Sequence, residues 1–250
     1  AAVARAPSAA VRAPESAGAG PSTAGPPLPT PPSSLWVDKY RPTSTADLVG
    51  NPGPVADLKA WLKDWEGVHL KGLPPRYVPS KKGTGKAAAA FVAGYGKKAV
   101  LLSGGPGVGK TSAALAVARE AGYTPVEVNA SDTRNQADKS ARLGVGGKLA
   151  NAIKEMATNA SLPGSGPGGA TRRTLLIMDE VDGMSAGDRG GVADLIATIR
   201  AARIPIITIA NDKHAPKLKS LRGHVLELDF AKPNALAVAK RLAGVCAAEG

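Results

Sequence analysis

Residues 99–112 read Ala-Val-Leu-Leu-Ser-Gly-Gly-Pro-Gly-Val-Gly-Lys-Thr-Ser, and this stretch decides the fold of the chain. An apolar run is followed by a glycine-rich turn and then by an alanine-rich stretch, an order that predicts a buried strand, a loop and a helix. Within the stretch, Gly104 to Thr111 fit the pattern G-x-x-x-x-G-K-[ST] of loops that bind nucleotide phosphates. The flanking strand and helix provide the context that this pattern requires.

Each part of the loop has a chemical role toward a phosphate. The glycines let backbone N–H groups curl around the anion, and the following helix points the positive end of its dipole at it. Lys110 is expected to reach the terminal phosphates, and the Thr111 hydroxyl is expected to bind Mg²⁺. The residues predicted to hold the nucleotide here are Gly105, Pro106, Gly107, Val108, Gly109, Lys110, Thr111 and Ser112.

Strands alternate with helices after the loop. Apolar runs predict strands at 124–128, 174–178, 204–210 and 225–230, and helices are expected over 189–202 and 233–248. The run at 174–178 does not alternate with polar residues, as expected for a strand that is covered on both faces. The pattern therefore predicts an α/β fold in which helices flank a five-stranded parallel sheet.

Composition divides the rest of the chain. Residues 1–34 are mostly Ala, Pro, Ser and Gly, which predicts a disordered linker. The interval 66–98 is basic and loop-like, and it is either an insertion that contacts DNA or a solvated surface loop. Between them a helix is expected to begin after Asn51, with a buried face at helical spacing formed by Val55, Leu58, Trp61, Leu62 and Trp65.

The charge balance favours an anionic partner. Thirty-two Lys and Arg against 20 Asp and Glu give a net charge of +12, which suits nucleic acid or a membrane surface. The single cysteine excludes an internal disulfide and suits a reducing compartment. The chain starts at an alanine rather than a methionine, so we expect it to be part of a longer protein.

Two acids follow the strand at 174–178. Their position places them at the carboxyl edge of the sheet, where open α/β sheets bind ligands. Asp179 is expected to hold Mg²⁺, and Glu180 is expected to act as the general base on an attacking water. Alone, such a pair is as often a turn as a site, but together with the phosphate loop it indicates hydrolysis of the β,γ bond of a nucleotide.

Asn211 follows the strand at 204–210 directly. It can orient the attacking water or contact the γ-phosphate, or it can simply form a turn. Strand order distinguishes these interpretations. If the strand before Asn211 lies between the strands that lead to Lys110 and Asp179, then Asn211 faces the nucleotide.

Several stretches together resemble the replication factor C clamp loaders, an AAA+ family, over about residues 35–250. The residues that carry the resemblance are Leu35-Trp-Val-Asp-Lys-Tyr-Arg-Pro42, Gly105-Pro-Gly-Val-Gly-Lys-Thr111, Glu127-Val-Asn-Ala-Ser-Asp-Thr-Arg134 and Leu176-Ile-Met-Asp-Glu-Val-Asp-Gly-Met-Ser185. Residues 188–191 and 204–212 look like the large subunit of that family. The resemblance implies a P-loop AAA+ core over 35–230 and the start of a helical lid, cut short, at 231–250.

The resemblance also implies a function. A protein of this kind works in the nucleus in a ring with four small subunits, and it uses ATP with Mg²⁺ to load the sliding clamp PCNA onto primer-template DNA in replication and repair. It further implies that Val37, Tyr40, Arg41, Val49 and Asn51 wall the adenine pocket, and that Thr133, Arg134 and Arg189 contact the DNA backbone without reading its sequence.

One departure from the family bears on activity. Small subunits carry Ser-Arg-Cys before the last strand, and that arginine reaches a neighbouring active site, whereas this chain has Gly223-His224-Val225. The chain is therefore expected to supply no arginine to a neighbour and, like a large subunit at the end of the ring, to receive one. Alone, it is expected to hydrolyse ATP weakly. The large subunit of a loader for cohesion or the DNA-damage checkpoint, and a nucleotide-binding scaffold without turnover, remain as alternatives.

Overall fold

The computed structural model describes residues 35–74, 96–130, 157, 173–184 and 191–250. The chain forms two compact units, Ala1–Lys39 and Tyr40–Gly250. In the first unit, the described residues include the short helix α1 (Trp36–Lys39), none of whose residues is buried. The predicted linker at 1–34 lies outside the described residues.

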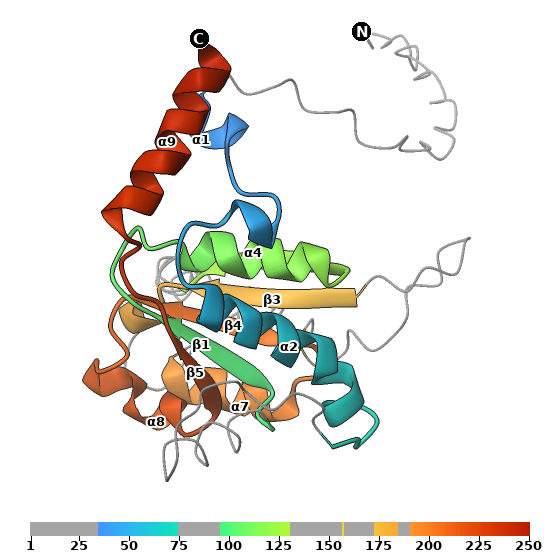
Figure 1. Ribbon diagram of the computed structural model, residues 1–250. Helices are drawn as coiled ribbons and strands as arrows, with labels where there is room; N and C mark the ends of the chain where they lie inside the picture. The colour runs from blue at the N-terminus through green and yellow to red at the C-terminus, as the bar shows by residue number, and fades with distance from the viewer. Residues whose placement is uncertain (1–34, 75–95, 131–156, 158–172, 185–190) are drawn as a thin grey trace, which may run out of the picture. The chain divides into compact units, whose positions relative to one another are not determined.

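The second unit contains a five-stranded parallel sheet (Figure 1). Its order is β2-β3-β4-β1-β5, so the strand of the phosphate loop lies between the last two strands of the chain. The sequence prediction of an α/β fold with five parallel strands flanked by helices is confirmed. The strands are β1 (Ala99–Ser103), β2 (Tyr123–Asn129), β3 (Arg173–Asp179), β4 (Ile206–Ala210) and β5 (Val225–Asp229).

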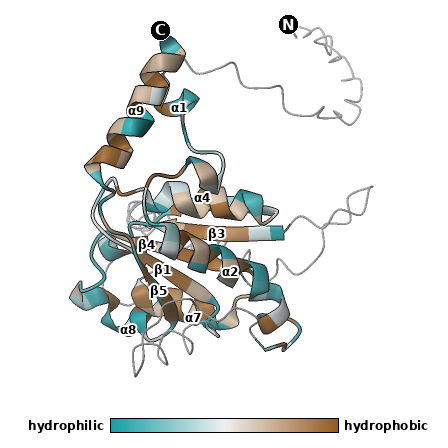
Figure 2. Ribbon diagram, in the orientation of Figure 1, coloured by the Kyte–Doolittle hydropathy of each residue, from teal (hydrophilic) through white to brown (hydrophobic). Residues whose placement is uncertain are grey.

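Alternate residues of each strand pack into two apolar layers, one on each face of the sheet. Val100 and Leu102 of β1 join the layer with α2 (Pro52–His69) and α4 (Lys110–Glu120). Leu101, between them, joins the opposite layer with α7 (Val192–Ala201) and α8 (Lys219–Arg222). Burying one such side chain contributes about 1.5–3 kcal/mol, so the two layers hold the helices on the sheet. Figure 2 shows β1 and most of β3 in the brown of apolar residues, with hydrophilic colour at the start of β3.

The remaining described elements are short, apart from one helix. Three 3₁₀ turns, η1 (Thr45–Asp47), η2 (Val181–Gly183) and η3 (Pro216–Leu218), lie in loops. Helix α9 (Ala235–Glu249) has no buried residue. Within the part of the chain that the structure describes, no helix combines the length and apolar character needed to cross a bilayer.

Helix α2 continues further than the sequence indicated. It ends at His69, so the first residues of the interval 66–98 are helical. The face predicted from helical spacing is buried, and its two tryptophans are core residues whose indole nitrogens have partners. Trp61 Nε1 donates to the Lys97 carbonyl at 3.0 Å, and Trp65 Nε1 donates to the Lys98 carbonyl at 2.9 Å. Residues 75–95 of this interval lie outside the described residues.

The two lysines that end this interval bind the domain's own backbone. Lys97 Nζ donates to the carbonyl of Val225 at 3.1 Å, and Lys98 Nζ donates to the carbonyl of Ala202 at 2.9 Å. These carbonyls lie at the amino end of the sheet, where helices return to the strands. Both ammonium groups are thus used to satisfy carbonyls at chain reversals, which is a structural role rather than the DNA contact considered for this interval.

The buried face of α2 supports a stability prediction. Trp65 is 1% exposed, so Trp65→Ala is expected to lower the free energy of unfolding by about 3–5 kcal/mol, because it leaves a large cavity in the apolar layer beneath α2. Urea unfolding followed by circular dichroism measures the change. The matched control is Leu236→Ala on α9, where the side chain is 77% exposed and the change is expected to stay within about 0.5 kcal/mol. Equal effects of the two substitutions would contradict the packing.

Candidate functional site

The strand order determines which side chains meet at the carboxyl edge of the sheet. Strand β4 pairs with β1 on one side and with β3 on the other. The residues that follow these three strands are therefore neighbours, which is the condition for Asn211 to face the phosphate loop. Lys110 Nζ lies 3.0 Å from Asn211 Oδ1 and donates a hydrogen bond to it.

The loop between β1 and α4 has the backbone of a phosphate cradle. Gly107 and Gly109 adopt φ values of +71° and +92°, which residues with side chains rarely adopt, and nothing lies within 4 Å of where their Cβ atoms would be. Gly104 is different, because a Cβ there would come within 2.2 Å of the Phe230 carbonyl oxygen. The loop is therefore closely packed at its base and open at its tip.

Most of the predicted loop residues are at least partly exposed. Pro106 and Gly107 are exposed, and Gly105, Gly109, Thr111 and Ser112 are partly buried. Val108 and Lys110 are the buried members of this set, and Val108, which is 5% exposed, packs in the apolar layer beside α4. Only its backbone can face a phosphate. Its apolar side chain instead anchors the middle of the loop to the core.

Lys110 is a buried cation held by neutral oxygens. Its side chain is 6% exposed, and Nζ also donates to the carbonyls of Gly104 at 2.7 Å and Gly105 at 2.8 Å. Among the described residues, no carboxylate forms a salt bridge with it. Burial lowers the pKa of Lys110, and the charges of Asp179 and Asp182 partly offset this shift. An anion bound above the loop would compensate the cost of this buried charge.

The hydroxyl and carboxylate expected to bind Mg²⁺ lie together. Thr111 Oγ1 donates to Asp179 Oδ2 at 2.7 Å, so the first turn of α4 meets the end of β3. A hydroxyl and a carboxylate are oxygen ligands, the kind that Mg²⁺ prefers. The hydroxyl, the carboxylate and the open glycine tip of the loop therefore fit a nucleoside triphosphate with Mg²⁺.

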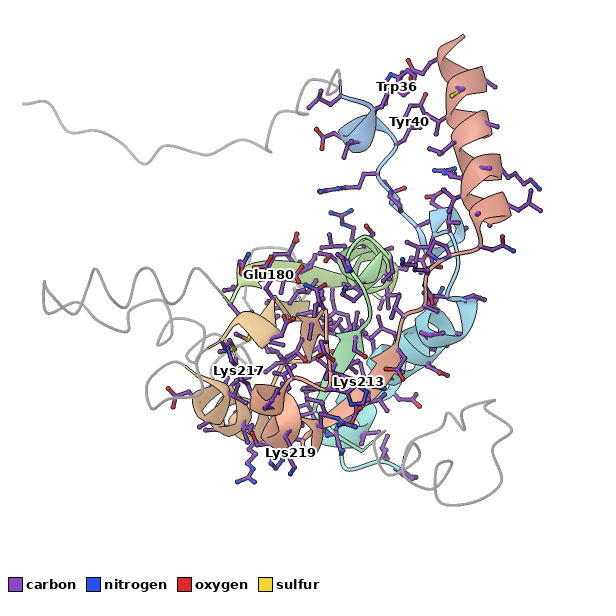
Figure 3. The ribbon with its side chains drawn as sticks, turned by 90° about the vertical axis from the view of Figure 1, so that its left-hand side faces the viewer. Trp36, Tyr40, Glu180, Lys213, Lys217 and Lys219 are labelled. Carbon is purple, nitrogen blue, oxygen red and sulfur yellow. The ribbon has the colours of Figure 1, made fainter. Side chains whose placement is uncertain are left out.

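Glu180 adopts a strained backbone conformation at the site. Its φ of 56° and ψ of 39° are left-handed, and its amide donates to Asp179 Oδ1 at 2.8 Å. A left-handed conformation costs a residue with a side chain about 1–2 kcal/mol, and such strain clusters at active sites. The Glu180 residue is exposed at the end of β3, where η2 begins (Figure 3).

Asp182 is a site residue that the sequence analysis did not assign. Its Oδ2 accepts a hydrogen bond from the backbone amide of Asn211 at 3.1 Å. This contact fixes the loop after β4 to the loop after β3. Asp182 stands three residues after Asp179 in the chain. The sequence indicated Asp182 only as a third acid close to Asp179 and Glu180. Its hydrogen-bond partner, Asn211, could be identified only from the strand order.

The residues expected to surround an adenine are divided between the two compact units, and their role stays a prediction. Val37 belongs to the first compact unit, which is described by itself. Tyr40 donates from its hydroxyl to Glu249 Oε1 of α9 at 2.5 Å (Figure 3), Arg41 is exposed and Val49 is partly buried. The Asn51 amide forms two hydrogen bonds with the backbone of Ala231, at 2.9 Å from Nδ2 and 2.8 Å to Oδ1.

The structure does not describe the residues that are expected to contact DNA. Thr133, Arg134 and Arg189 lie outside the described residues. Their role stays a prediction from the resemblance. The position that carries an arginine in small subunits is described, however, and His224 there is partly buried with Nε2 lying 3.3 Å from Arg200 Nη2.

This fold and site define a P-loop ATPase, and the chain belongs to the ATPase family associated with various cellular activities (AAA), which it matches over residues 100–228. Its relatives include replication factor C subunit 1 of Oryza sativa subsp. japonica, 48% identical over 87% of this chain and 20% of the relative. The human replication factor C subunit 1 is 37% identical over 86% of this chain and 18% of the relative.

An archaeal protein shows the same similarity. The replication factor C large subunit of Methanocella arvoryzae is 39% identical over 86% of this chain and 31% of the relative. The resemblance to the replication factor C large subunit is thus confirmed as a similarity of sequence. The chain spans about a fifth of the length of the plant relative, so these matches concern one region of much longer proteins.

The buried charge of Lys110 leads to a binding prediction. Lys110→Ala is expected to weaken ATP binding by about tenfold or more, because charge-assisted hydrogen bonds to the phosphates are lost. Titration with a fluorescent ATP analogue measures the affinity. The control is Lys63→Ala, which removes an exposed cation from α2 and is expected to leave the affinity unchanged. A Lys110→Ala variant that is folded and binds normally would exclude a role for Lys110 in phosphate binding.

Proposed function

We propose that this chain is the ATPase region of the large subunit of a replication factor C clamp loader. The observation that carries the proposal is the buried Lys110 beside the Thr111–Asp179 pair, in a chain whose relatives are replication factor C large subunits. The full protein would act in the nucleus with four small subunits, and it would use ATP to load PCNA onto primer-template DNA during replication and repair.

The proposed chemistry divides among five side chains. Lys110 binds the terminal phosphates, while Thr111 and Asp179 hold Mg²⁺, which neutralises charge on the phosphates when bound. Glu180 accepts a proton from the attacking water. Asn211, whose amide oxygen faces Lys110 Nζ, positions that water or the γ-phosphate. In this proposal, residues at the start of α4 bind the nucleotide, and the attacking water approaches from the side of β3 and β4.

Two further parts of the proposal concern the neighbours of the chain. Because Gly223-His224-Val225 lacks the arginine of the small subunits, this chain would supply no arginine to a neighbouring site, and its own site would be completed by an arginine from an adjacent small subunit. The isolated chain would then turn ATP over slowly. Thr133, Arg134 and Arg189 would contact DNA phosphates, which suits binding that is independent of sequence.

The role of Glu180 is tested in a complex reconstituted from the full-length protein and four small subunits. In that complex Glu180→Gln is expected to lower ATP turnover at the site of this chain by about 10²- to 10⁴-fold, because an amide cannot accept the proton of the water. ATP affinity is expected to stay within about twofold, since the group acts only in the transition state. Phosphate release and nucleotide titration measure the two quantities.

The outcomes separate three interpretations. Lys110→Ala in the same complex is the comparison and should lose binding as well as turnover. Normal turnover by the Glu180→Gln complex would remove Glu180 from the role of base. A wild-type complex that binds ATP at full stoichiometry and never hydrolyses it would favour the nucleotide-binding scaffold over the clamp loader ATPase.

The DNA contacts are tested through salt dependence. The double variant Arg134→Ala with Arg189→Ala is expected to weaken DNA binding equally across sequences and to reduce the slope of log K against log salt by about one unit for each arginine. Fluorescence anisotropy over a salt series measures both. Arg173→Ala is the control, because this arginine already pairs with Glu66 at 3.0 Å. An unchanged slope in the double variant would show that the two arginines are ordinary surface charges.

A further inference from the structure

Three side chains outside the proposed catalytic set meet at the base of the phosphate loop. Asp229, the last residue of β5, accepts a hydrogen bond from Ser103 Oγ at 2.7 Å. The same carboxylate pairs with Lys213, whose Nζ lies 2.7 Å from Oδ1 and 2.6 Å from Oδ2. The sequence analysis assigned no role to either partner of this ion pair. Figure 3 labels Lys213 among the side chains of this region.

The ion pair between Lys213 and Asp229 spans the end of a strand that lies between them. Lys213 follows β4 and Asp229 ends β5, and β1 lies between these two strands. The Lys213 side chain therefore reaches past the end of β1, where the phosphate loop begins. Ser103, the last residue of β1, is the direct register partner of Asp229. One carboxylate thus joins the ends of β1 and β5 to the loop after β4.

The loop that Lys213 holds is the loop that carries Asn211. On the side of β3, the backbone amide of Asn211 donates a hydrogen bond to Asp182 Oδ2 at 3.1 Å. On the side of β5, Lys213 binds Asp229, and the two residues that flank Lys213 are joined by a hydrogen bond from the His214 backbone amide to Asp212 Oδ1 at 2.8 Å. The loop is therefore fixed to a strand end on each side of β4. These two anchors set where the Asn211 amide oxygen stands relative to Lys110.

The Asp229 end of this connection is rigidly supported. The Phe230 amide donates to the Ser103 carbonyl at 2.7 Å, which extends the pairing of β5 with β1 beyond the last strand residue. Gly104, the first residue of the phosphate loop, lies against the Phe230 carbonyl so closely that a Cβ would meet it at 2.2 Å. A carboxylate on this segment is therefore held in fixed register with the phosphate loop.

From this arrangement we infer that Lys213 and Asp229 are positioning residues for nucleotide hydrolysis. Neither touches the reacting atoms; the pair holds the Asn211 loop in register with the phosphate loop. The inference rests on the proposed function, because it assumes that Asn211 acts on the γ-phosphate or its water. The Lys213 side chain is 23% exposed and that of Asp229 is 59% exposed, so the pair is solvent-screened and its effect on the rate is modest.

The kinetic test uses the reconstituted complex. Lys213→Met and Asp229→Asn are each expected to lower kcat by about two- to fivefold, the range that a screened ion pair can supply, while the KM for ATP stays unchanged. Lys213→Arg retains the charge and is expected to keep most of the wild-type kcat. Wild-type kcat in both neutral variants would overturn the inference, as would a fall in ATP affinity that matches the fall in kcat.

The matched control is a second ion pair that also involves β5. Arg222 Nε lies 3.1 Å from Glu227 Oε1, and the two side chains are 35% and 28% exposed. Glu227 lies two residues before Asp229, further from the carboxyl end of the strand. Glu227→Gln removes a comparable ion pair and is expected to leave kcat unchanged. A fall in kcat equal to that of Asp229→Asn would mean that any charge loss on β5 suffices, and would also overturn the inference.

A readout independent of turnover separates this inference from the proposed function. In the full-length protein without nucleotide, hydrogen exchange of the Asn211 and His214 amides is expected to be faster in Lys213→Met than in the wild type. Unchanged exchange would show that the ion pair does not hold the loop. Faster exchange with normal kcat would make the pair purely structural, which also overturns the inference. Absence of turnover in the wild-type complex would instead refute the proposed function, whatever the exchange shows.

Discussion

The structure of the site depends on one buried positive charge. Lys110 is held at the start of α4 with its ammonium group among carbonyl oxygens and the Asn211 amide oxygen. These neutral acceptors satisfy its hydrogens but do not neutralise its charge, and burial lowers its pKa. A protein keeps such a charge at a cost, which an anion can offset.

The parallel sheet converts distant sequence segments into neighbours. Asp179, Asn211 and Asp229 each stand at or directly after the carboxyl end of a strand, so they meet along one edge. Because β4 lies between β1 and β3, Asn211 stands between the phosphate loop and the acids. The same order makes Lys213 reach past the end of β1 to Asp229. The contacts proposed for catalysis and for positioning therefore share one geometric origin.

Net positive charge does not translate directly into a surface for nucleic acid. Lys97 and Lys98 bind backbone carbonyls at the amino end of the sheet, and Lys213 pairs with Asp229. Lys110 is buried beside the phosphate loop. All four count toward the charge of +12, and none is presented freely to DNA. The proposed electrostatic attraction to DNA therefore depends more on Arg134 and Arg189 than the net charge suggests.

Sequence by itself determined the local features: the phosphate loop, the apolar strands and the spacing that buries Trp61 and Trp65. These follow from short-range chemistry, since glycine conformations, strand length and helical periodicity are set within about ten residues. Tertiary structure alone decided that Asn211 meets Lys110, that Lys97 and Lys98 bind backbone carbonyls, and that Asp182 and Asp229 anchor the Asn211 loop. Those contacts depend on strand order and register, which arise from packing between segments far apart in the chain and leave no local pattern.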